Sequence, residues 1–333
     1  MALKVLIADK FETSGIEGLK ALGCEVQLSP ELGPDTLPAA IAAFEPDILI
    51  VRSTKVPAPV IEGAESLKAI IRAGAGFDNI DIDAAAARGI GVCNCPGMNA
   101  VAVAEVAFAH LLCADRRLPE QLSDLRAGKW RKKEYAKARG IKGLTLGVIG
   151  VGAIGRAIVQ RAKAFEMDVI GWDVIMTAAR AAELGIRNGG STRADLLKML
   201  PKCDAVSLHI AANAETKNMC NAEFFAAMKP GAYFINTSRG TVVDEQALKA
   251  AILDKGVRAG LDVYQNQPPT PEMAWTTELA SLPGVTCTHH CGASTDQAQQ
   301  AVADETVRIV KVFSETGKLE HLVNEPQAAG AAG

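Results

Sequence analysis

Short runs of apolar residues alternate along this chain with longer stretches that have the spacing of amphipathic helices. In the first third the apolar runs occupy residues 5–8, 25–28, 48–51, 69–72 and 91–94. Buried parallel strands are apolar almost throughout, as Ile48-Leu49-Ile50-Val51 is, because helices cover both faces of their sheet. The alternation therefore predicts an α/β unit with a parallel sheet over roughly the first 95 residues.

A second set of strands follows a long helical pattern over residues 99–126 and a basic, glycine-containing stretch that ends at Gly143. This set comprises residues 144–149, 168–172, 205–209, 233–236, 258–262 and 285–288, and six strands are typical of a dinucleotide-binding sheet. A last helix is predicted to begin at Ser294, with Gln297 completing a capping box, and to end near Gly317. Residues 326–333 lack apolar periodicity and predict a disordered tail.

Composition narrows the class of protein. A length of 333 residues has room for two domains, and 49% hydrophobic with 22% charged residues excludes a disordered chain. The net charge of −3 provides no overall attraction to nucleic acid or to an anionic membrane. The N-terminus shows no signal peptide, and eight scattered cysteines are typical of buried, reduced thiols, so we expect a cytoplasmic protein.

The sharpest motif is Gly150-Val151-Gly152-Ala153-Ile154-Gly155, which directly follows a predicted strand and opens a helix. Gly150 allows a tight turn, Gly152 lets a pyrophosphate approach the backbone, and Gly155 brings helix and strand together. Asp173 stands 18 residues after Gly155, where its carboxylate can accept hydrogen bonds from both ribose hydroxyls of an adenosine. The same charge would repel a 2′-phosphate, so the motif favours NAD over NADP.

Three polar segments stand at the ends of later strands, at residues 236–240, 261–269 and 288–295. The first carries Arg239, whose guanidinium can hold a carboxylate through two hydrogen bonds and polarise the neighbouring carbonyl. Gly240 would relieve crowding beside it. An ordinary interdomain salt bridge is the alternative role for Arg239.

Together with the glycine motif, these segments resemble the D-2-hydroxyacid dehydrogenase family, most closely its phosphoglycerate dehydrogenase branch. The resemblance covers nearly the whole chain, from residues 51–54 and 72–79 through 128–130 to 323–324. It implies two doubly wound parallel-sheet domains. A Rossmann NAD-binding domain, 99–292, is inserted in a discontinuous substrate domain, 1–98 and 293–325, which clasps it around an active-site cleft. It also implies a homodimer through the NAD domain, with a homotetramer left open.

The resemblance assigns roles to individual residues. The catalytic residues are Arg239, Gln267 and His290. The cofactor-binding residues are Gly150, Gly152, Ala153, Ile154, Gly155, Asp173, Ile210, Thr237, Ser238, Arg239, Asp262, His290, Gly292 and Ala293. The substrate-binding residues are Arg52, Ser53, Arg72, Gly74, Ala75, Gly76, Asn99 and Arg239.

Gln267 departs from the family pattern, which has Glu at this position. Oxidation of an alcohol needs a group that removes the hydroxyl proton as hydride leaves, and the imidazole of His290 is suited to this near neutral pH. A neutral Gln267 can orient that ring but cannot stabilise an imidazolium, so the pKa of His290 should be lower than with Glu. His289 and Ala211 also replace residues that are usually Pro in the family.

The expected activity is NAD-dependent oxidation of a D-2-hydroxyacid, with 3-phosphoglycerate as the favoured substrate and 3-phosphohydroxypyruvate as its product. Alternatives are a reductase of another 2-oxoacid such as hydroxypyruvate or glyoxylate, an enzyme similar to formate dehydrogenase, and an NAD(H)-sensing binding protein. The substrate is expected to meet Arg52, Arg72 and the backbone N–H groups of residues 74–76, with the basic cluster 131–133 either near it or simply exposed.

Cys287, His289 and Cys291 would share one face of an extended strand and could ligate zinc. No fourth ligand is placed by spacing, and we predict no metal.

Overall fold

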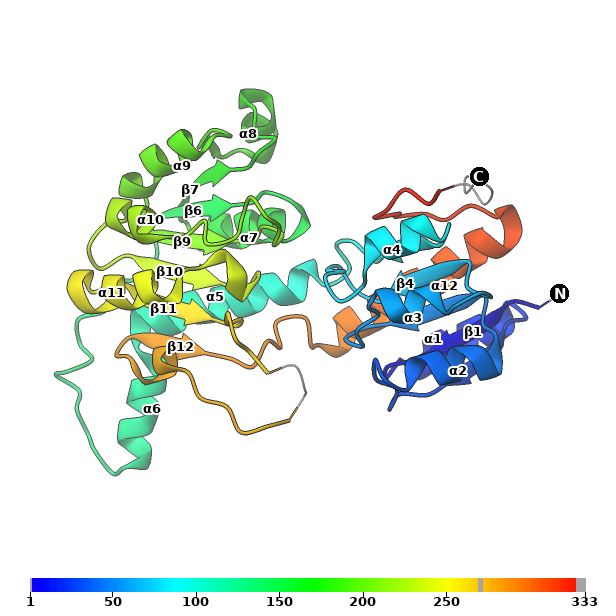
Figure 1. The fold of residues 1–333 in the computed structure, drawn as a ribbon. Coiled ribbons are helices and arrows are strands. Elements are labelled where there is room, and N and C mark those ends of the chain that lie inside the picture. The colour runs from blue at the N-terminus through cyan, green and yellow to red at the C-terminus, as the bar shows by residue number, and fades with distance from the viewer. Residues whose placement is uncertain (1, 269–271, 328–333) are drawn as a thin grey trace. The chain divides into compact units, whose positions relative to one another are not determined.

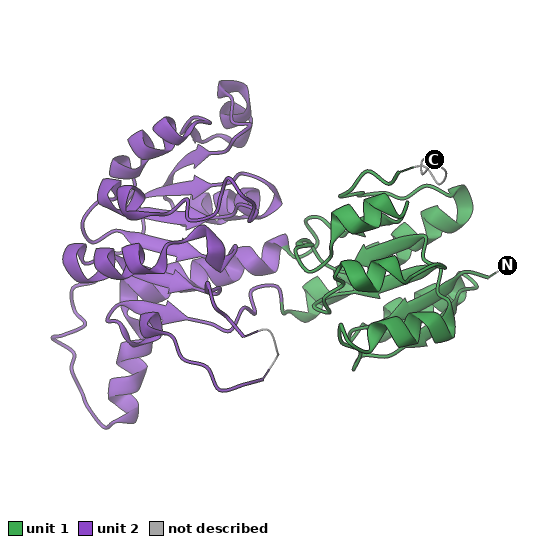
Figure 2. Ribbon diagram, in the orientation of Figure 1, with its two compact units in different colours: residues 1–99, 294–333 green, residues 100–293 purple. Residues whose placement is uncertain are grey.

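A computed structural model describes residues 2–268 and 272–327 of the chain. Two compact units make up the protein, one of residues 1–99 with 294–333 and one of residues 100–293 (Figure 2). Each unit is built on one parallel sheet with helices on both faces (Figure 1). The predicted fold class, two parallel-sheet α/β domains, is confirmed.

The sheet of the first unit has five parallel strands in the order β2-β1-β3-β4-β5. Their bounds are Lys4–Ile7 (β1), Glu25–Leu28 (β2), Ile48–Val51 (β3), Ala69–Arg72 (β4) and Gly91–Asn94 (β5). β3 and β5 are buried along their whole length, which explains why their sequences are continuous in hydrophobicity. Only β1 differs from its predicted bounds, by one residue.

Five helices cover this sheet: α1 (Thr13–Ala21), α2 (Leu37–Phe44), α3 (Ala58–Glu62), α4 (Ile82–Ala87) and α12 (Asp296–Thr316). One face packs on α2, α3 and α4, and the other on α1 and α12. The capping box expected at Ser294 is wrong by one residue. The backbone N–H of Ala298 donates to Thr295 Oγ1 at 3.2 Å, so Thr295 is the N-cap. Gly317, at φ 70°, ends the helix where predicted.

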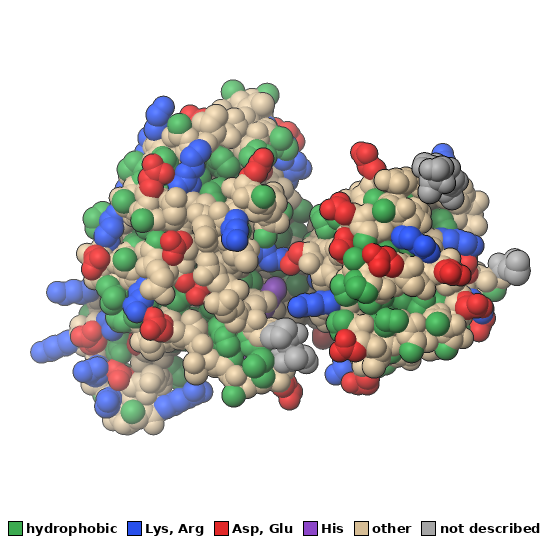
Figure 3. Space-filling view, viewed as in Figure 1, with side chains coloured by type: hydrophobic (Ala, Val, Ile, Leu, Met, Phe, Trp, Pro, Cys, Tyr) green, Lys and Arg blue, Asp and Glu red, His purple; other side chains and the backbone are tan. Residues whose placement is uncertain are grey.

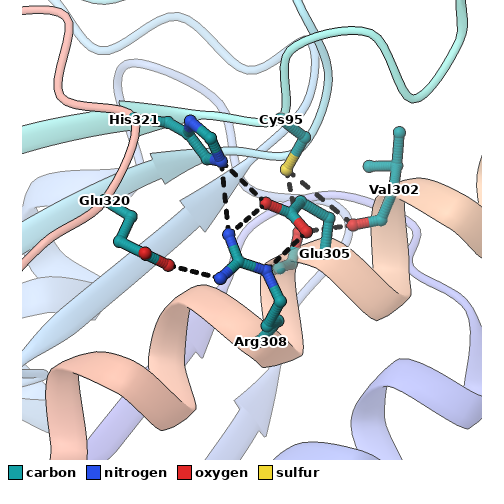
Figure 4. Close-up of polar contacts among 7 residues, drawn as sticks. Cys95, Val302, Glu305, Arg308, Glu320 and His321 are labelled. Carbon is teal, nitrogen blue, oxygen red and sulfur yellow. Dashed lines mark hydrogen bonds and ion pairs between the residues drawn. The ribbon is translucent and has the colours of Figure 1, made fainter.

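A charged cluster secures the segment that follows α12 (Figure 4). The Glu305 carboxylate, 9% exposed, accepts hydrogen bonds from Arg308 at 2.7 and 2.8 Å and lies 2.9 Å from His321 Nε2. The hydrogen bonds from Arg308 hold the pKa of Glu305 below its usual range. Beyond this cluster, Gln327 N donates to Ala86 O at 2.9 Å, within the predicted tail 326–333. The rest of that tail, 328–333, lies outside the described residues.

The second unit has seven parallel strands in the order β12-β11-β10-β9-β6-β7-β8. Their bounds are Thr145–Ile149 (β6), Asp168–Trp172 (β7), Arg187–Asn188 (β8), Ala205–Leu208 (β9), Tyr233–Asn236 (β10), Arg258–Leu261 (β11) and Val285–Cys287 (β12). Six strands were expected. β8 was missed because it has two exposed residues, too few to form an apolar pattern.

The helices of the second unit are α5 (Ala100–Arg116), α6 (Leu118–Arg126), α7 (Ala153–Ala164), α8 (Ala178–Leu184), α9 (Arg193–Met199), α10 (Ala222–Ala227) and α11 (Glu245–Lys255). Short 3₁₀ turns occupy Leu200–Lys202, Gly240–Val242 and Glu278–Ser281. The single helix predicted over 99–126 is wrong. Arg117 takes a left-handed conformation at φ 54°, and Pro119 stands in the first turn of α6, where its missing N–H costs no hydrogen bond.

Helix α6 has no buried residue, and Leu118, Leu122 and Leu125 are exposed along it. On the face drawn in Figure 3, acidic and basic side chains are interspersed, and they form no continuous field of one sign there. Within residues 2–268 and 272–327, no helix is both long and apolar enough to cross a bilayer.

Candidate active site

The strand order of the second unit fixes where a ligand can bind. The chain runs outward from β6 through β7 to β8, and then returns to the other side of β6 to form β9. In open parallel sheets, ligands bind beyond the carboxyl ends of the strands at such a reversal. Gly150 follows β6 and His209 follows β9, so the glycine motif lies at this point.

Close packing requires two of the three glycines of the motif. Gly150 has φ 88°, and a Cβ there would lie 2.3 Å from the carbonyl oxygen of His209. A Cβ at Gly155 would lie 2.0 Å from the carbonyl oxygen of Gly150, so helix α7 can meet β6 only through glycine. At Gly152 a Cβ would meet nothing within 4 Å. The loop therefore has an open backbone face at the start of α7, as a bound pyrophosphate would require.

Asp173, directly after β7, is tied to this loop. Its Oδ2 accepts the backbone N–H of Val151 at 2.7 Å, and its Oδ1 accepts that of Ile175 at 3.1 Å. Each carboxylate oxygen can accept a further hydrogen bond, so the ribose role predicted for Asp173 is compatible with this bracing. Arg180, which the sequence did not single out, donates to the carbonyl oxygen of Val151 at 3.1 Å.

Other predicted cofactor residues surround the same sheet edge. Ala153 and Ile154 form the first turn of α7, and Ile210 packs close to Gly150. The Oγ1 of Thr237 is buried and has no hydrogen-bond partner within residues 2–268 and 272–327. Such an atom fits a polar group of a bound dinucleotide, because a buried hydroxyl without a partner is costly.

Asp262 follows β11 and is 1% exposed. Its Oδ1 accepts the Thr288 hydroxyl at 2.5 Å and the Cys291 N–H at 3.0 Å, and its Oδ2 accepts the Gly292 N–H at 2.8 Å. A buried carboxylate needs such donors to remain charged. Because two of them come from the residues directly after His290, Asp262 fixes the loop that carries this histidine.

Gln267 and His290 are in contact, with Gln267 Nε2 2.7 Å from His290 Nδ1. The backbone N–H of Tyr264 lies 3.3 Å from Gln267 Oε1. A backbone N–H can only donate, so the atom that faces it must be the carboxamide oxygen. The amide nitrogen then faces His290 and donates to Nδ1, which places the proton of a neutral ring on Nε2.

Arg239 follows β10, and its Nη1 donates to the carbonyl oxygen of Ser238 at 2.9 Å. Ser238 in turn donates to Asn236 Oδ1 through both its N–H and its hydroxyl. A Cβ at Gly240 would lie 2.0 Å from the carbonyl carbon of Tyr264, so this glycine lets the loop after β10 meet the loop that carries Gln267. Arg239, Gln267 and His290 thus stand on the loops after three adjacent strands.

His209 is a polar feature of the site that the sequence had not assigned. Its Nε2 lies 2.8 Å from the Ser207 hydroxyl. Although the residue as a whole is only half-buried, enclosure of the ring lowers the pKa of His209 to about 3. His209 is therefore neutral beside the glycine loop at physiological pH.

The predicted substrate residues lie at the corresponding edge of the first unit. The Asp9 carboxylate accepts the backbone N–H groups of Arg52, Ser53 and Thr54 at 2.6, 3.2 and 3.2 Å, and the Ser53 hydroxyl at 2.9 Å. Asp9 was missed, because it lies 43 residues from Arg52 and no local pattern links them.

The loop after β4 is equally constrained. Gly74 has φ 148°, and a Cβ there would lie 1.7 Å from Arg72 Nη1, so Arg72 folds over a position that only glycine can occupy. Asn94 Nδ2 donates to the Ala75 carbonyl oxygen at 2.6 Å. The Oδ1 of Asn99 is buried without a hydrogen-bond partner among the described residues. Gly76 continues this loop.

Cys287, His289 and Cys291 do not form the face proposed for zinc. β12 ends at Cys287, and His290 has φ 54°, so the alternation of an extended strand stops between them. Among the described residues, no three His, Cys, Asp or Glu side chains are grouped closely enough to hold a metal ion.

The second unit is thus a doubly wound nucleotide-binding domain with an Arg, a Gln–His pair and a buried Asp at its ligand edge. Residues 108–292 match the family model described as D-isomer specific 2-hydroxyacid dehydrogenase, NAD binding domain. The chain belongs to this family, whose members are NAD-linked oxidoreductases that act on CH–OH donors. The resemblance inferred from the sequence is confirmed.

Two curated relatives and one solved structure illustrate the match. D-3-phosphoglycerate dehydrogenase of Methanocaldococcus jannaschii is 36% identical over 97% of this chain and 60% of its own length. Hydroxypyruvate reductase of Thermotoga maritima is 41% identical over 82% of this chain and 86% of its own length. The structure of a glyoxylate reductase from Paecilomyes thermophila is 28% identical, with a TM-score of 0.85 and coverage of 97% of this chain and 99% of that chain.

The chain spans about three fifths of the length of the first of these relatives.

Proposed function

We propose that the protein is an NAD-dependent D-2-hydroxyacid dehydrogenase that oxidises 3-phosphoglycerate to 3-phosphohydroxypyruvate. The observation that carries the proposal is the placement of Arg239, of the Gln267–His290 pair and of Asp262 after adjacent strands of the sheet that also holds the glycine loop. These residues supply an anion-binding cation, a group that exchanges protons and a cofactor-binding carboxylate.

The residues divide the chemistry between them. NAD, held by the glycine loop and Asp173, would supply the hydride acceptor. Arg239 holds the substrate carboxylate and polarises the oxygen on the reacting carbon, as a guanidinium can through two hydrogen bonds. His290 exchanges the hydroxyl proton through Nε2, the ring nitrogen that Gln267 does not contact. Asp262 holds the backbone on which His290 is presented.

The orientation of the Gln267 carboxamide determines whether His290 can accept a proton from the substrate. In the observed orientation the amide nitrogen donates to Nδ1, so a neutral His290 has its proton on Nε2 and can donate a hydrogen bond, but not accept a proton, at that atom. To accept the substrate proton at Nε2, the ring must carry its proton on Nδ1, and the carboxamide must then rotate to present Oε1 and release the Tyr264 N–H. A carboxylate at position 267 would accept from Nδ1–H without rotation.

The substrate phosphate is assigned to Arg52, which the Asp9 carboxylate holds at the end of β3. Replacing Arg52 with Ala should raise the Michaelis constant for the phosphorylated substrate about tenfold or more, because a charge-assisted hydrogen bond contributes about 1.5–3 kcal/mol. The Michaelis constant for glycerate should change little. An equal change for both substrates would contradict the assignment.

A steady-state comparison of phosphohydroxypyruvate, hydroxypyruvate, glyoxylate, pyruvate and formate with NAD(H) tests the function. The proposal predicts the highest kcat/KM for phosphohydroxypyruvate. A preference for hydroxypyruvate or glyoxylate would assign the protein to the 2-oxoacid reductases instead. Turnover of formate alone would favour a formate dehydrogenase, whose reaction needs no proton exchange at His290, and tight NADH binding with no turnover would favour an NAD(H) sensor.

We also propose that the protein acts in the cytoplasm as a homodimer formed through the second unit. All eight cysteines are free, which suits a reducing compartment. Leu118, Leu122 and Leu125 leave an apolar stripe exposed on α6, and Trp130 nearby is 80% exposed. Sedimentation of the wild type and of a Leu122→Glu variant tests this, since a dimer through α6 should weaken in the variant.

A further inference from the structure

A network of polar side chains, three of them buried and Thr288 half-buried, extends from Asp262 away from the ligand edge. It consists of Asp262 and Thr288, which directly follow the adjacent strands β11 and β12, of Thr286 within β12, and of His110 in helix α5. The Thr288 hydroxyl contacts Asp262 Oδ1 at 2.5 Å, His110 Nε2 lies 3.0 Å from Thr288 Oγ1, and His110 Nδ1 lies 2.7 Å from Thr286 Oγ1. His110 is 4% exposed and none of the roles above uses it.

The direction of every hydrogen bond in this network can be assigned by starting from Asp262. The Asp262 carboxylate accepts two backbone N–H groups, so it is an acceptor and the Thr288 hydroxyl must donate to it. Thr288 Oγ1 can then only accept, so His110 Nε2 carries the ring proton and donates. His110 Nδ1 is left as an acceptor and receives the Thr286 hydroxyl. The contacts thus define one tautomer of His110.

The fold provides for a histidine at this position. β11 pairs with β12 in register, with Leu261 opposite Cys287, and Thr288 N donates to Leu261 O at 2.9 Å, which sets Asp262 and Thr288 side by side. A Cβ at Gly260 would lie 2.4 Å from the Cβ of His110, so glycine in β11 makes the space that α5 needs to bring the ring in. Burial lowers the pKa of His110, although the Asp262 charge opposes it, and so favours the neutral ring.

We propose that His110 is a positioning residue, which acts through Thr288 to orient Asp262 and thereby the NAD site and the loop that carries His290. The hydrogen bond from Nε2 fixes the rotation of the Thr288 hydroxyl, so that its proton stays directed at Asp262 Oδ1. Asp262 Oδ2 then retains the orientation in which it binds Gly292 N–H and can accept from the cofactor. This inference rests on the proposed function only in taking Asp262 as a cofactor residue.

The first test measures NADH affinity by fluorescence titration, without turnover. His110→Leu should weaken NADH binding about fivefold, because one hydrogen bond contributes about 1 kcal/mol. Thr288→Val should weaken it at least as much, whereas Thr288→Ser, which keeps the hydroxyl, should restore it to within about twofold. In an Asp262→Asn background, His110→Leu should have little further effect. If His110→Leu weakens NADH binding by the same factor in the wild type and in Asp262→Asn, His110 acts independently of Asp262 and the proposal is overturned.

A second test uses the wild-type protein and does not depend on how the variants fold. With ¹⁵N-labelled histidine, the ring of His110 should give the signals of a neutral ring protonated at Nε2, unchanged from pH 8 to pH 6. The chain has five histidines, so the assignment is tractable. A ring protonated at Nδ1, or one that titrates in this range, would contradict the proposed hydrogen bond from His110 to Thr288. Absence of 2-oxoacid turnover in the wild type would refute the proposed function and leave both of these tests intact.

Discussion

Asp9 in the first unit and Asp262 in the second solve the same structural problem in different surroundings. Each carboxylate follows a strand of a parallel sheet and captures backbone N–H groups of a loop that carries a candidate ligand-binding residue, Arg52 or His290. Asp9 is half-buried, whereas Asp262 is 1% exposed. Both carboxylates also accept a hydroxyl, that of Ser53 or of Thr288, but only the hydroxyl bound to the more deeply buried Asp262 is itself held by an imidazole, that of His110.

The difference follows from the free energy of burying charge. A carboxylate near water exchanges solvent for protein donors at little net gain, whereas a carboxylate removed from water depends on its protein donors to remain ionised. Each donor lost at Asp262 therefore has a larger effect than one lost at Asp9. Rigidity is expected where proton exchange needs a fixed geometry, and adaptability where a substrate anion is only bound.

Asp262→Asn should have the largest effect of the substitutions that break this comparison. In the variant, the amide NH₂ group replaces one carboxylate oxygen and faces a hydrogen-bond donor. We therefore expect transition-state stabilisation to fall by about 2–3 kcal/mol, which is about 30- to 150-fold in kcat/KM for the 2-oxoacid. Steady-state kinetics with NADH measures it. Asp254→Asn, on the exposed face of α11, is the matched control. Near-normal kinetics in Asp262→Asn would contradict the role of the buried charge.

Gln267→Glu changes the residue that contacts His290 and should shift the pH dependence of carbonyl reduction. Reduction of the carbonyl needs a protonated His290, and a carboxylate at 267 would stabilise the imidazolium. Wild-type reduction should therefore be lost at a pH about one unit lower than in the variant, which is about tenfold in rate between the two midpoints. The measurement is the pH profile of kcat/KM, with Gln160→Glu on α7 as a control of equal charge. Superimposable profiles would refute the Gln267–His290 assignment.

Asp9→Asn should have a smaller effect and act on binding. The loop of Arg52 would lose charge-assisted hydrogen bonds at a half-buried site, so we expect the Michaelis constant for the phosphorylated substrate to rise about fivefold, corresponding to about 1 kcal/mol. The kcat should stay within about twofold, because Arg52 touches no reacting atom. A fall in kcat as large as that of Asp262→Asn would remove the contrast between the two carboxylates.

The prediction for His209 concerns stability and not catalysis. Because its pKa is lowered to about 3 in the folded protein, the unfolded chain binds the proton first as the pH falls below about 6.5. Stability present above that pH is thus lost as the pH falls towards 3, by at most about 1.4 kcal/mol per pH unit. The free energy of unfolding, measured with urea at pH values between 7 and 5, should fall less steeply with pH in His209→Gln than in the wild type. Equal slopes would contradict a neutral, enclosed ring.

The sequence predicted the parts of this architecture that local patterns encode. Apolar runs located the strands, and the glycines between β6 and α7 identified the dinucleotide loop, because each depends on residues near one another in the chain. The break at Arg117 escaped detection, since Pro119 is tolerated in a first helical turn and the left-handed residue before it is not a glycine.

The supporting hydrogen bonds could not be predicted in the same way. His110 meets Thr288 across 178 residues and Asp9 meets Arg52 across 43, and neither pair has a sequence pattern that requires the contact. In the sequence, nothing distinguishes His110 from a histidine without a role in an apolar helix. Its role depends on the register of β11 with β12 and on the space beside Gly260, which only the folded structure defines.

Transfer of deuterium from NADH labelled at the nicotinamide C4 tests the central claim most directly. The protein would be incubated with each stereospecifically labelled reductant and phosphohydroxypyruvate, and the product examined by mass spectrometry. We predict that one of the two labelled reductants delivers deuterium to C2 of D-3-phosphoglycerate, and that His290→Asn reduces this transfer by at least about 100-fold. A protein that binds NADH but delivers no label to phosphohydroxypyruvate or to any other 2-oxoacid would contradict the account.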